Sequence, residues 1–271
     1  MQRTLSGRPA VITGAASGIG RSLARRLSRH GSPLAIADVD EAGLAETAAS
    51  LEGPVLSRVL DVRDADDVRR FARETRDWLS LPLAAVFNNA GVATHTTVLK
   101  SVPEDDSWLF DINFWGVVNG TRAFLPQLVE RNYGVVVNTS SVYGLLGMPK
   151  QSAYCASKFA VRGFTDSLRQ ELRGTGVSAV TVHPGGIKTN IVRNGRMHAE
   201  LDEQGRSLEQ IAADFDKVAL TTPDRAAEII HRGVERGRAR ILVGPDAHVF
   251  DALARIAPTR YFSVMARLFE Q

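Results

Sequence analysis

The chain is poor in cysteine and has no long apolar run. Among its 271 residues Cys155 is the only cysteine, which excludes an internal disulfide and a cysteine metal cage. The six histidines lack the short spacings of metal ligands, so no metal site is predicted. No run of about 18 apolar residues marks a transmembrane helix. Residues 1–8 lack the apolar part of a signal peptide, so we expect a cytoplasmic protein.

There is also little net charge. The chain has 33 Lys and Arg against 30 Asp and Glu, a formal charge of +3. Nucleic-acid-binding proteins usually carry a clustered basic stripe. The densest basic cluster runs from Arg21 to His30, and helical spacing places it opposite Ile19, Leu23 and Leu27. We therefore interpret it as a solvated helix face and expect no nucleic-acid partner.

What the sequence does contain is a regular alternation of short apolar runs and helical patterns. The runs lack polar alternation, which is typical of parallel strands covered on both faces. The predicted strands are Pro9–Thr13, Pro33–Asp38, Val55–Asp61, Leu83–Asn88, Gly134–Ser140, Val177–His183 and Ala239–Val243. Between them, apolar residues three and four apart predict helices over Leu44–Leu51, Val68–Leu79, Trp108–Leu128 and Phe159–Leu172.

Strands that alternate with helices imply βαβ units with right-handed crossovers. The series has no internal repeat and no linker-like break. We therefore predict one α/β domain of the Rossmann type, spanning the whole chain with its core at about residues 8–244. Its doubly wound, mostly parallel sheet would have seven strands with helices on both faces.

Two segments interrupt the alternation. Asn190–Thr222 is long and polar, with helical stretches at His198–Leu201 and Leu208–Phe215. It follows the carboxyl end of the sixth strand, where open α/β sheets bind ligands, so we expect a substrate lid. Residues 245–271 form a C-terminal extension whose apolar side chains favour a docking helix or a subunit contact over a membrane-surface helix. These side chains are Tyr261, Phe262, Met265 and Phe269.

A glycine-rich turn follows the first predicted strand. Residues 13–20 read TGAASGIG, and a helix is predicted to begin within them. Glycines allow a tight turn and a close approach of the backbone to a pyrophosphate, which the free N–H groups of a helix start favour. The spacing is GxxxGxG rather than GxGxxG, and on its own it is a weak signal.

Asp38 ends the second predicted strand. A carboxylate there can accept hydrogen bonds from both ribose hydroxyls of an adenosine and would repel a 2′-phosphate. Val39 follows, so no adjacent basic residue offsets the charge. NAD(H) is therefore favoured over NADP(H). The competing structural role is that of an N-cap for the next helix, which Asp40 suits better.

Tyr154 and Lys158 stand four residues apart on a predicted helix, which places them on one face. Ser141 precedes Tyr154 by thirteen residues and follows a predicted strand. The other signals are the glycine turn, the Asn88–Gly91 turn after the fourth strand, Asn113 in a helix and Pro184–Thr189 after the sixth strand. In this order the set resembles the short-chain dehydrogenase/reductase family, over roughly residues 8–244.

The resemblance implies a role for each of four residues. Tyr154 would be the general acid and base, and Lys158 would also hold the nicotinamide ribose. Ser141 would hydrogen-bond the substrate oxygen; the thirteen-residue spacing matches it rather than Ser140. Asn113 would hold a water in a proton relay behind Lys158.

The resemblance also implies the cofactor contacts. The residues around the pyrophosphate would be Gly14, Ser17, Gly18, Ile19 and Gly20. Asp61 and Val62 would lie by the adenine, Asn89 and Gly91 would line the cofactor, and Ile187 and Thr189 would meet its carboxamide end.

Hydride transfer at a carbonyl carbon requires a proton at the oxygen. Lowering the pKa of a phenol from about 10 to about 7 takes roughly 4 kcal/mol of preference for the phenolate. An ammonium at Lys158, one helical turn from Tyr154, can supply part of it, together with the positive ring of NAD⁺.

The substrate pocket is predicted to be apolar. Its candidate residues are Val92, Val142, Leu145, Leu146, Met148 and Ile191, with Tyr143 and His95 as further candidates. The nearby cations are His183 and Lys188. Cys155 points away from the face that carries Tyr154 and is expected to be a buried structural thiol.

We therefore predict an NAD(H)-dependent oxidoreductase that interconverts an apolar secondary alcohol and its ketone. Two alternatives stay open: an NADPH-dependent reductase of the 3-oxoacyl carrier-protein type, and a non-catalytic NAD-binding protein. The family resemblance further implies a homodimer or homotetramer that packs through the Trp108–Leu128 and Phe159–Leu172 helices.

Overall fold

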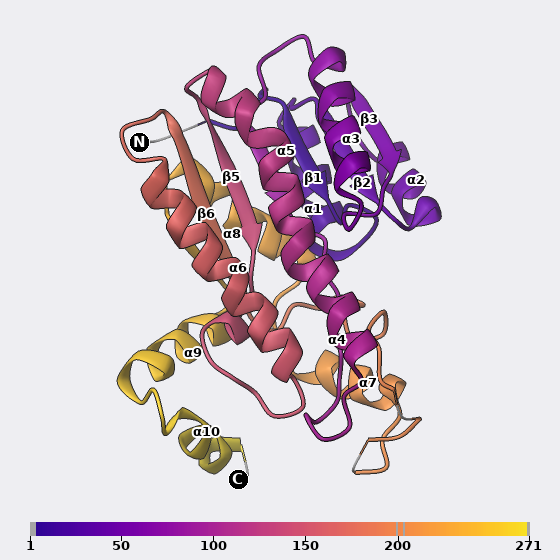
Figure 1. Cartoon of the computed structure of the whole chain (residues 1–271), viewed down its shortest axis with the longest axis vertical. Helices are drawn as coiled ribbons and strands as arrows, with labels where there is room; N and C mark the ends of the chain where they lie inside the picture. Colours follow the sequence, from indigo (N-terminus) through magenta and orange to yellow (C-terminus); the bar gives the residue numbers. More distant parts are fainter. Residues whose placement is uncertain (1–3, 199, 203, 270–271) are drawn as a thin grey trace.

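The predicted apolar runs pair side by side into one parallel sheet (Figure 1). The computed structural model describes residues 4–198, 200–202 and 204–269. The strands are β1 (Ala10–Thr13), β2 (Leu34–Asp38), β3 (Val55–Val59), β4 (Ala85–Asn88), β5 (Gly134–Thr139), β6 (Val177–Pro184) and β7 (Arg240–Val243). Their order is β3-β2-β1-β4-β5-β6-β7, which confirms the doubly wound, seven-stranded prediction.

Helices cover both faces of this sheet. One face carries α1 (Gly18–Arg29), α2 (Glu41–Ala49) and α8 (Pro223–Glu235). The other carries α3 (Ala65–Trp78), α5 (Gly116–Glu130) and α6 (Ser152–Glu171), several of which lie in front in Figure 1. The short helix α4 (Pro103–Phe110) lies below the sheet in this view and contacts α6. No helix of the described residues is long and apolar enough to cross a membrane.

The strands lack polar alternation because each of their faces meets a separate apolar core. In β1, Ile12 belongs to the core beneath α1 and α8, while its neighbour Val11 belongs to the core beneath α3 and α5. Val11 pairs with Ala35 and Ile12 with Ile36 in β2, which repeats the same division. Both faces of these central strands are buried, so their positions favour apolar residues, whereas the edge strand β3 is partly exposed and contains Ser57 and Arg58.

Two helical predictions need correction. The helix expected over Trp108–Leu128 is interrupted by a π-helical turn at Asp111–Trp115, between α4 and α5. The described residues of His198–Leu201 form no helix, and Ala199 lies outside them. The helix expected over Leu208–Phe215 is confirmed as α7 (Leu208–Val218).

The segments after β6 and β7 gather at one end of the molecule. In Figure 1 this is the lower end, with α7 on one side and α9 (Pro245–Ile256) and α10 (Tyr261–Phe269) on the other. The carboxyl ends of the parallel strands point to this end, which is where open α/β sheets bind ligands. The site is therefore expected there.

Candidate active site

Tyr154 and Lys158 lie on the same face of α6, as their spacing predicts. Tyr154 is 8% exposed and Lys158 2%. The Nζ atom of Lys158 lies 5.6 Å from the centroid of the Tyr154 ring and donates a hydrogen bond to the Thr139 carbonyl at 3.2 Å. The carbonyl at the end of β5 thus holds the lysine amine beside the phenol.

The two serines after β5 have different surroundings. The Ser140 hydroxyl donates to the Lys158 carbonyl at 2.7 Å, so it is bound to the backbone of α6. The Ser141 hydroxyl accepts from the Tyr143 amide at 3.1 Å and is also a hydrogen-bonding partner of the Tyr154 hydroxyl. Ser141 is therefore the serine that faces the phenol, as the spacing indicates.

Burial controls the ionisation of this pair. Desolvation raises the pKa of Tyr154 well above its ordinary range, although the hydrogen bond from Ser141 opposes the rise. Burial also lowers the pKa of Lys158 to about 8. The expected lowering of the tyrosine pKa is thus not a property of the polypeptide alone, because burial raises this pKa by more than the hydrogen bond of Ser141 lowers it.

His183 was expected to be a cation near the site, and the structure corrects this. It is fully buried in β6, and its Nδ1 lies 2.9 Å from the Ser141 carbonyl oxygen. Burial lowers the pKa of His183 to about 4. The ring is therefore neutral near pH 7 and acts as a support for the backbone of Ser141.

Asn113 lies in the π-helical turn and joins three elements. Its Oδ1 accepts from the Val92 amide at 2.8 Å, and its Nδ2 donates to the Val92 carbonyl at 2.9 Å and to the Ser157 hydroxyl at 3.2 Å. A Cβ atom on Gly91 would lie 3.1 Å from Asn113 Oδ1 and 3.2 Å from Lys158 Nζ. The Oδ1 atom of Asn113 and the Nζ atom of Lys158 therefore both lie close to Gly91, which has no side chain to displace them.

The glycine turn leaves an open cradle at the start of α1. Gly14 has φ +68°, and a Cβ there would lie 2.7 Å from the Ala90 Cα. A Cβ on Gly20 would lie 2.0 Å from the Gly14 carbonyl oxygen. Ser17 is the N-cap residue, yet its side chain makes no capping hydrogen bond, and the first turn has no acidic residue. The uncapped N–H groups fit the pyrophosphate of a dinucleotide.

The remaining turn residues surround this cradle. Thr189 lies over it, with its methyl group 3.0 Å from the position of a Cβ on Gly18. Asn89 braces it, because its amide nitrogens donate to Thr13 Oγ1 at 3.1 Å and to the Gly14 carbonyl at 3.3 Å. Ile19 packs against the core beside α1, and Ile187 is buried within that core. Asn89 and Thr189 therefore lie beside the glycine turn, and Ile187 lies in the core on the α1 side of the sheet.

Asp38 lies where a ribose-binding carboxylate is expected. Its Oδ2 accepts from the Ala16 amide at 2.9 Å, inside the glycine turn. Asp40, as anticipated, caps α2 by accepting from the Gly43 amide at 3.1 Å. Arg21 is engaged with α2, donating to Thr47 at 2.9 Å and pairing with Glu46 at 3.0 Å. Arg21 also donates to the Ala16 carbonyl, so it links α2 to the glycine turn. The second oxygen of Asp38 accepts from the Asp40 amide at 3.1 Å, so backbone amides hold this carboxylate at the turn.

Asp61 has a partner that the sequence did not reveal. Arg63 pairs with its carboxylate at 2.6 Å. Burial raises the pKa of Asp61, but the hydrogen bonds from Arg63 outweigh this effect and lower it overall. The neighbouring Val62 is buried against Gly116, whose Cβ position would lie 2.6 Å from the valine side chain. Val62 therefore packs against the start of α5, while the Asp61 carboxylate is held by Arg63.

The residues between Ser141 and Tyr154 form an apolar wall. Val142, Leu145 and Leu146 are buried, and the Tyr143 ring meets the Tyr154 ring edge to face at 6.1 Å between centroids. Cys155 is buried and accepts from the Met148 amide at 3.4 Å. Burial raises its pKa, as expected for a structural thiol.

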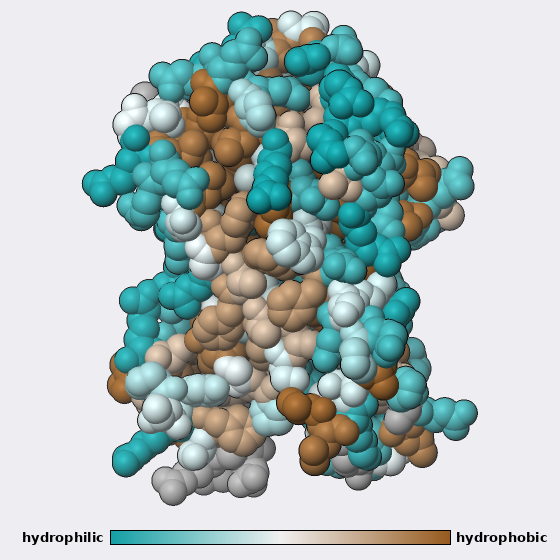
Figure 2. Space-filling view, in the orientation of Figure 1, coloured by the Kyte–Doolittle hydropathy of each residue, from teal (hydrophilic) through white to brown (hydrophobic). Residues whose placement is uncertain are grey.

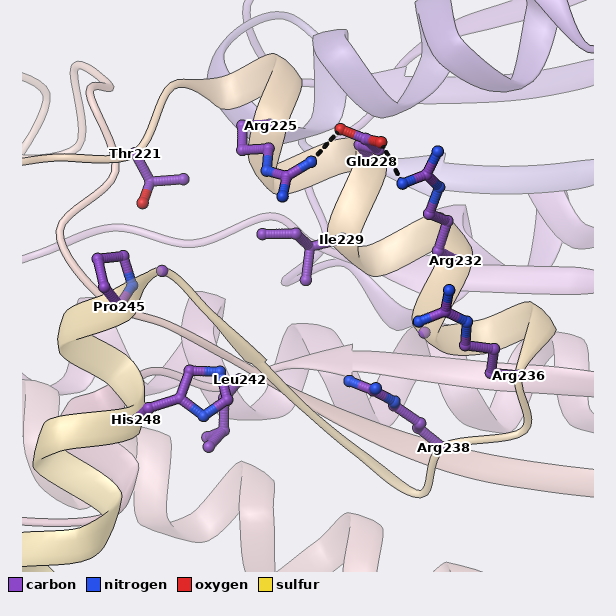
Figure 3. A pocket seen from close by; sticks show the side chains of 12 residues that line it. Thr221, Arg225, Glu228, Ile229, Arg232, Arg236, Arg238, Leu242, Pro245 and His248 are labelled. Carbon is purple, nitrogen blue, oxygen red and sulfur yellow. Dashed lines mark hydrogen bonds and ion pairs between the residues drawn. The ribbon is translucent and has the colours of Figure 1, made fainter.

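An open groove lies away from these residues (Figure 3). It has a volume of about 370 Å³ and lies between α8, β7 and the start of α9. Arg225 and Arg232 in its wall share Glu228, while Arg236 and Arg238 lie on the turn before β7. Because none of the predicted catalytic residues lines it, we do not assign it to the reaction.

Comparison with known proteins supports the prediction of an oxidoreductase. The family model described as short chain dehydrogenase matches residues 8–200. The Mycobacterium tuberculosis protein SadH, whose name describes an oxidoreductase, is 44% identical over 269 residues that cover 97% of this chain and 95% of SadH.

Two solved structures show the range of cofactors among similar proteins. A short chain dehydrogenase/reductase from Burkholderia phymatum in complex with NAD gives a TM-score of 0.85 at 30% identity, covering 93% of this chain and 94% of its own. One from Burkholderia cenocepacia in complex with NADP gives 0.78 at 24% identity, covering 98% and 99%, a likeness that shows the fold alone.

The fold and the relatives together define an oxidoreductase that uses a nicotinamide cofactor. The chain belongs to the short-chain dehydrogenase/reductase family.

Proposed function

We propose that the protein is an NAD(H)-dependent oxidoreductase that interconverts an apolar secondary alcohol and its ketone. The observation that carries this proposal is the meeting of Ser141, Tyr154 and Lys158 at the carboxyl end of β5. A hydrogen-bonding serine, a phenol and an amine in contact are the groups that proton transfer at a carbonyl oxygen requires.

Asp38 supports NAD(H) rather than NADP(H). The carboxylate lies at the glycine turn, hydrogen-bonded to the Ala16 amide. Two like unit charges about 4 Å apart repel by about 4 kcal/mol at an effective dielectric constant near 20. A 2′-phosphate beside Asp38 would meet this repulsion, whereas a ribose with two free hydroxyls would gain hydrogen bonds.

The mechanism assigns one task to each site residue. NAD, when bound, supplies the hydride acceptor or donor. Ser141 holds the substrate oxygen, and Tyr154 takes the hydroxyl proton during oxidation or returns it during reduction. Lys158 stabilises the phenolate and passes protons onward. The side-chain amide of Asn113 already bonds Val92 and Ser157. We therefore propose that the water of the proton relay behind Lys158 lies beside Asn113, next to the backbone of the π-helical turn.

The surroundings of Tyr154 favour an apolar substrate. Val142, Leu145 and Leu146 are buried on the adjoining loop, and Tyr143 packs against the catalytic ring. His183 is neutral, so it offers no positive charge to a substrate carboxylate. We propose that the substrate binds between this loop and residues 190–222, which act as the lid.

Helices α5 and α6 support a homodimer or homotetramer. Figure 2 shows an apolar band over this region, flanked by hydrophilic surface. Trp115 is 47% exposed at the start of α5, and Phe159 on α6 and Val129 on α5 are also exposed. Burying these side chains against a second copy would remove apolar surface from water. We propose this assembly together with a cytoplasmic location.

Cofactor titration followed by one substitution tests the proposal. Tryptophan fluorescence should report tight binding of NADH and weak binding of NADPH. Tyr154→Phe should then lower kcat for secondary alcohols by at least about a thousandfold, because proton transfer is lost, with unchanged affinity for NADH. Full activity of Tyr154→Phe would rule out the assigned acid and base.

A further inference from the structure

The C-terminal extension contacts a loop that borders the cofactor side of the site. Asp246, in the first turn of α9, accepts a hydrogen bond from the Gly186 amide at 2.6 Å. Gly186 belongs to the segment after β6 that also carries Ile187 and Thr189. A Cβ on Gly185 would lie 2.1 Å from the same carboxylate. The start of α9 is therefore bound closely to the segment proposed to meet the nicotinamide.

The other end of the extension contacts the substrate loop, residues 142–151. The Tyr261 hydroxyl donates to the Gly147 carbonyl at 2.9 Å and accepts from the Gly147 amide at 3.0 Å. One side chain thus pairs both backbone groups of a residue 114 positions earlier in the chain. A Cβ on Gly147 would lie 3.3 Å from the hydroxyl, so glycine permits this close approach.

The rest of α10 shows that Tyr261 is part of a docked surface. Met265, one helical turn later on the same face, is 5% exposed. Phe262 and Val264, on other faces, are exposed. The helix therefore packs through the face that carries Tyr261 and Met265.

The anchored residue is placed where it controls the substrate wall. Gly147 directly follows the buried Leu146 and precedes Met148, whose amide donates to Cys155 beside Tyr154. A shift of the loop at Gly147 would move these side chains relative to the catalytic ring. Such a shift would change the space for the apolar part of a substrate more than the position of its reacting carbon.

We propose that the C-terminal extension is a positioning element that selects the substrate by size. Tyr261 fixes the substrate loop through Gly147, and Asp246 fixes the nicotinamide-side segment through Gly186, so one pair of helices sets the distance between the two walls. This inference rests on the proposed alcohol–ketone activity. Tyr261 touches neither the cofactor nor the reacting atoms and acts through the loop.

The test compares Tyr261→Phe with Tyr133→Phe, which removes a tyrosine hydroxyl from the turn between α5 and β5, outside the site. Both are assayed with NAD⁺ and either 2-octanol or 2-propanol. Tyr261→Phe should raise KM for 2-octanol by about tenfold or more, because the loop loses both hydrogen bonds of the Tyr261 hydroxyl. Its KM for 2-propanol and both kcat values should stay within about twofold, and Tyr133→Phe should match the wild type.

Hydrogen exchange of residues 142–151 provides a readout that is independent of activity. Tyr261→Phe should exchange in this loop about tenfold faster than either the wild type or Tyr133→Phe. Asp246→Ala should weaken NADH binding and should affect the oxidation of 2-octanol and 2-propanol equally. Unchanged NADH affinity in Asp246→Ala would overturn that half of the proposal.

The remaining outcomes separate this proposal from the proposed function. Wild-type loop exchange in Tyr261→Phe overturns the anchor, whatever the activity. Faster exchange with equal KM changes for both alcohols overturns size selection and indicates general loosening. If the wild-type enzyme oxidises neither alcohol, the substrate assignment fails, and the exchange result alone decides whether Tyr261 positions the loop.

Discussion

Replacing Asp38 by asparagine should convert the preference for NAD into acceptance of NADP. Asparagine keeps the shape of the side chain and one oxygen that can accept from the Ala16 amide, a bond of 2.9 Å in the wild type. It removes the charge that would face a 2′-phosphate. For unit charges about 4 Å apart, this repulsion is about 1 kcal/mol in bulk water and about 4 kcal/mol near a protein surface.

Asp38 is partly exposed, so the effect should fall between these limits. The ratio of kcat/KM for NADP⁺ to that for NAD⁺ should therefore rise by about fivefold to about 800-fold. The measurement is initial-rate kinetics with both cofactors and one alcohol. Asp40→Asn is the matched control, because it removes a carboxylate two residues away and leaves a good N-cap for α2.

If Asp38→Asn changed the ratio of kcat/KM for NADP⁺ to that for NAD⁺ by less than about threefold, the electrostatic argument would be refuted. An equal change in Asp40→Asn would also refute it, because general charge near α2 rather than the ribose contact would then set the preference.

Three further predictions concern stability and packing. His183→Asn should reduce the loss of unfolding free energy at acid pH. The pKa of His183 is about 4 in the fold against about 6.5 unfolded, so the wild type should lose about 3 kcal/mol of unfolding free energy as the pH falls from 6.5 to 4. Urea titrations of His183→Asn should lack this loss. Asn113→Ala should cost about 2–4 kcal/mol, since it leaves both backbone groups of Val92 without this partner; a shift of the urea midpoint near zero would contradict the assigned contacts. Gly14→Ala and Gly7→Ala strain the backbone alike, with φ +68° and +69°, but only a side chain at Gly14 would lie against other atoms. Thermal melts should show a loss of about 1 kcal/mol of unfolding free energy for Gly7→Ala and a clearly larger loss for Gly14→Ala. Gly14→Ala should also weaken NADH binding.

The strands were predictable from sequence because their signal is local. Val11 and Ile12 face different cores, so both positions are apolar and the run is visible in the sequence. The π-helical turn at Asp111–Trp115 was missed because a wider turn adds a residue without changing the composition of the helix. Its consequence, the placement of Asn113 against Val92, therefore appeared only in the structure.

The site shows the same division between local and long-range information. The placement of Tyr154 and Lys158 on one helical face follows from their four-residue spacing, and the pairing of Ser141 with Tyr154 was implied by the family resemblance. The neutral state of His183 depends on burial, which no spacing reveals. The contact of Tyr261 with Gly147 joins residues 114 positions apart and has no local signal. Sequence thus predicts which groups lie together at the carboxyl end of β5 better than it predicts their charges or what holds them.

The arginines around β7 protect an open edge of the sheet. β7 is the last strand in the sheet order, and an edge strand presents backbone groups that can pair with another chain. Arg240 on the strand pairs with Asp251 of α9, and Arg236 and Arg238 lie on the turn before it. A second copy adding its own β7 parallel to this edge would bring the two arginine turns together, whereas antiparallel addition would keep them apart. Parallel addition at this edge would therefore depend on salt, or on an anion that neutralises the arginines.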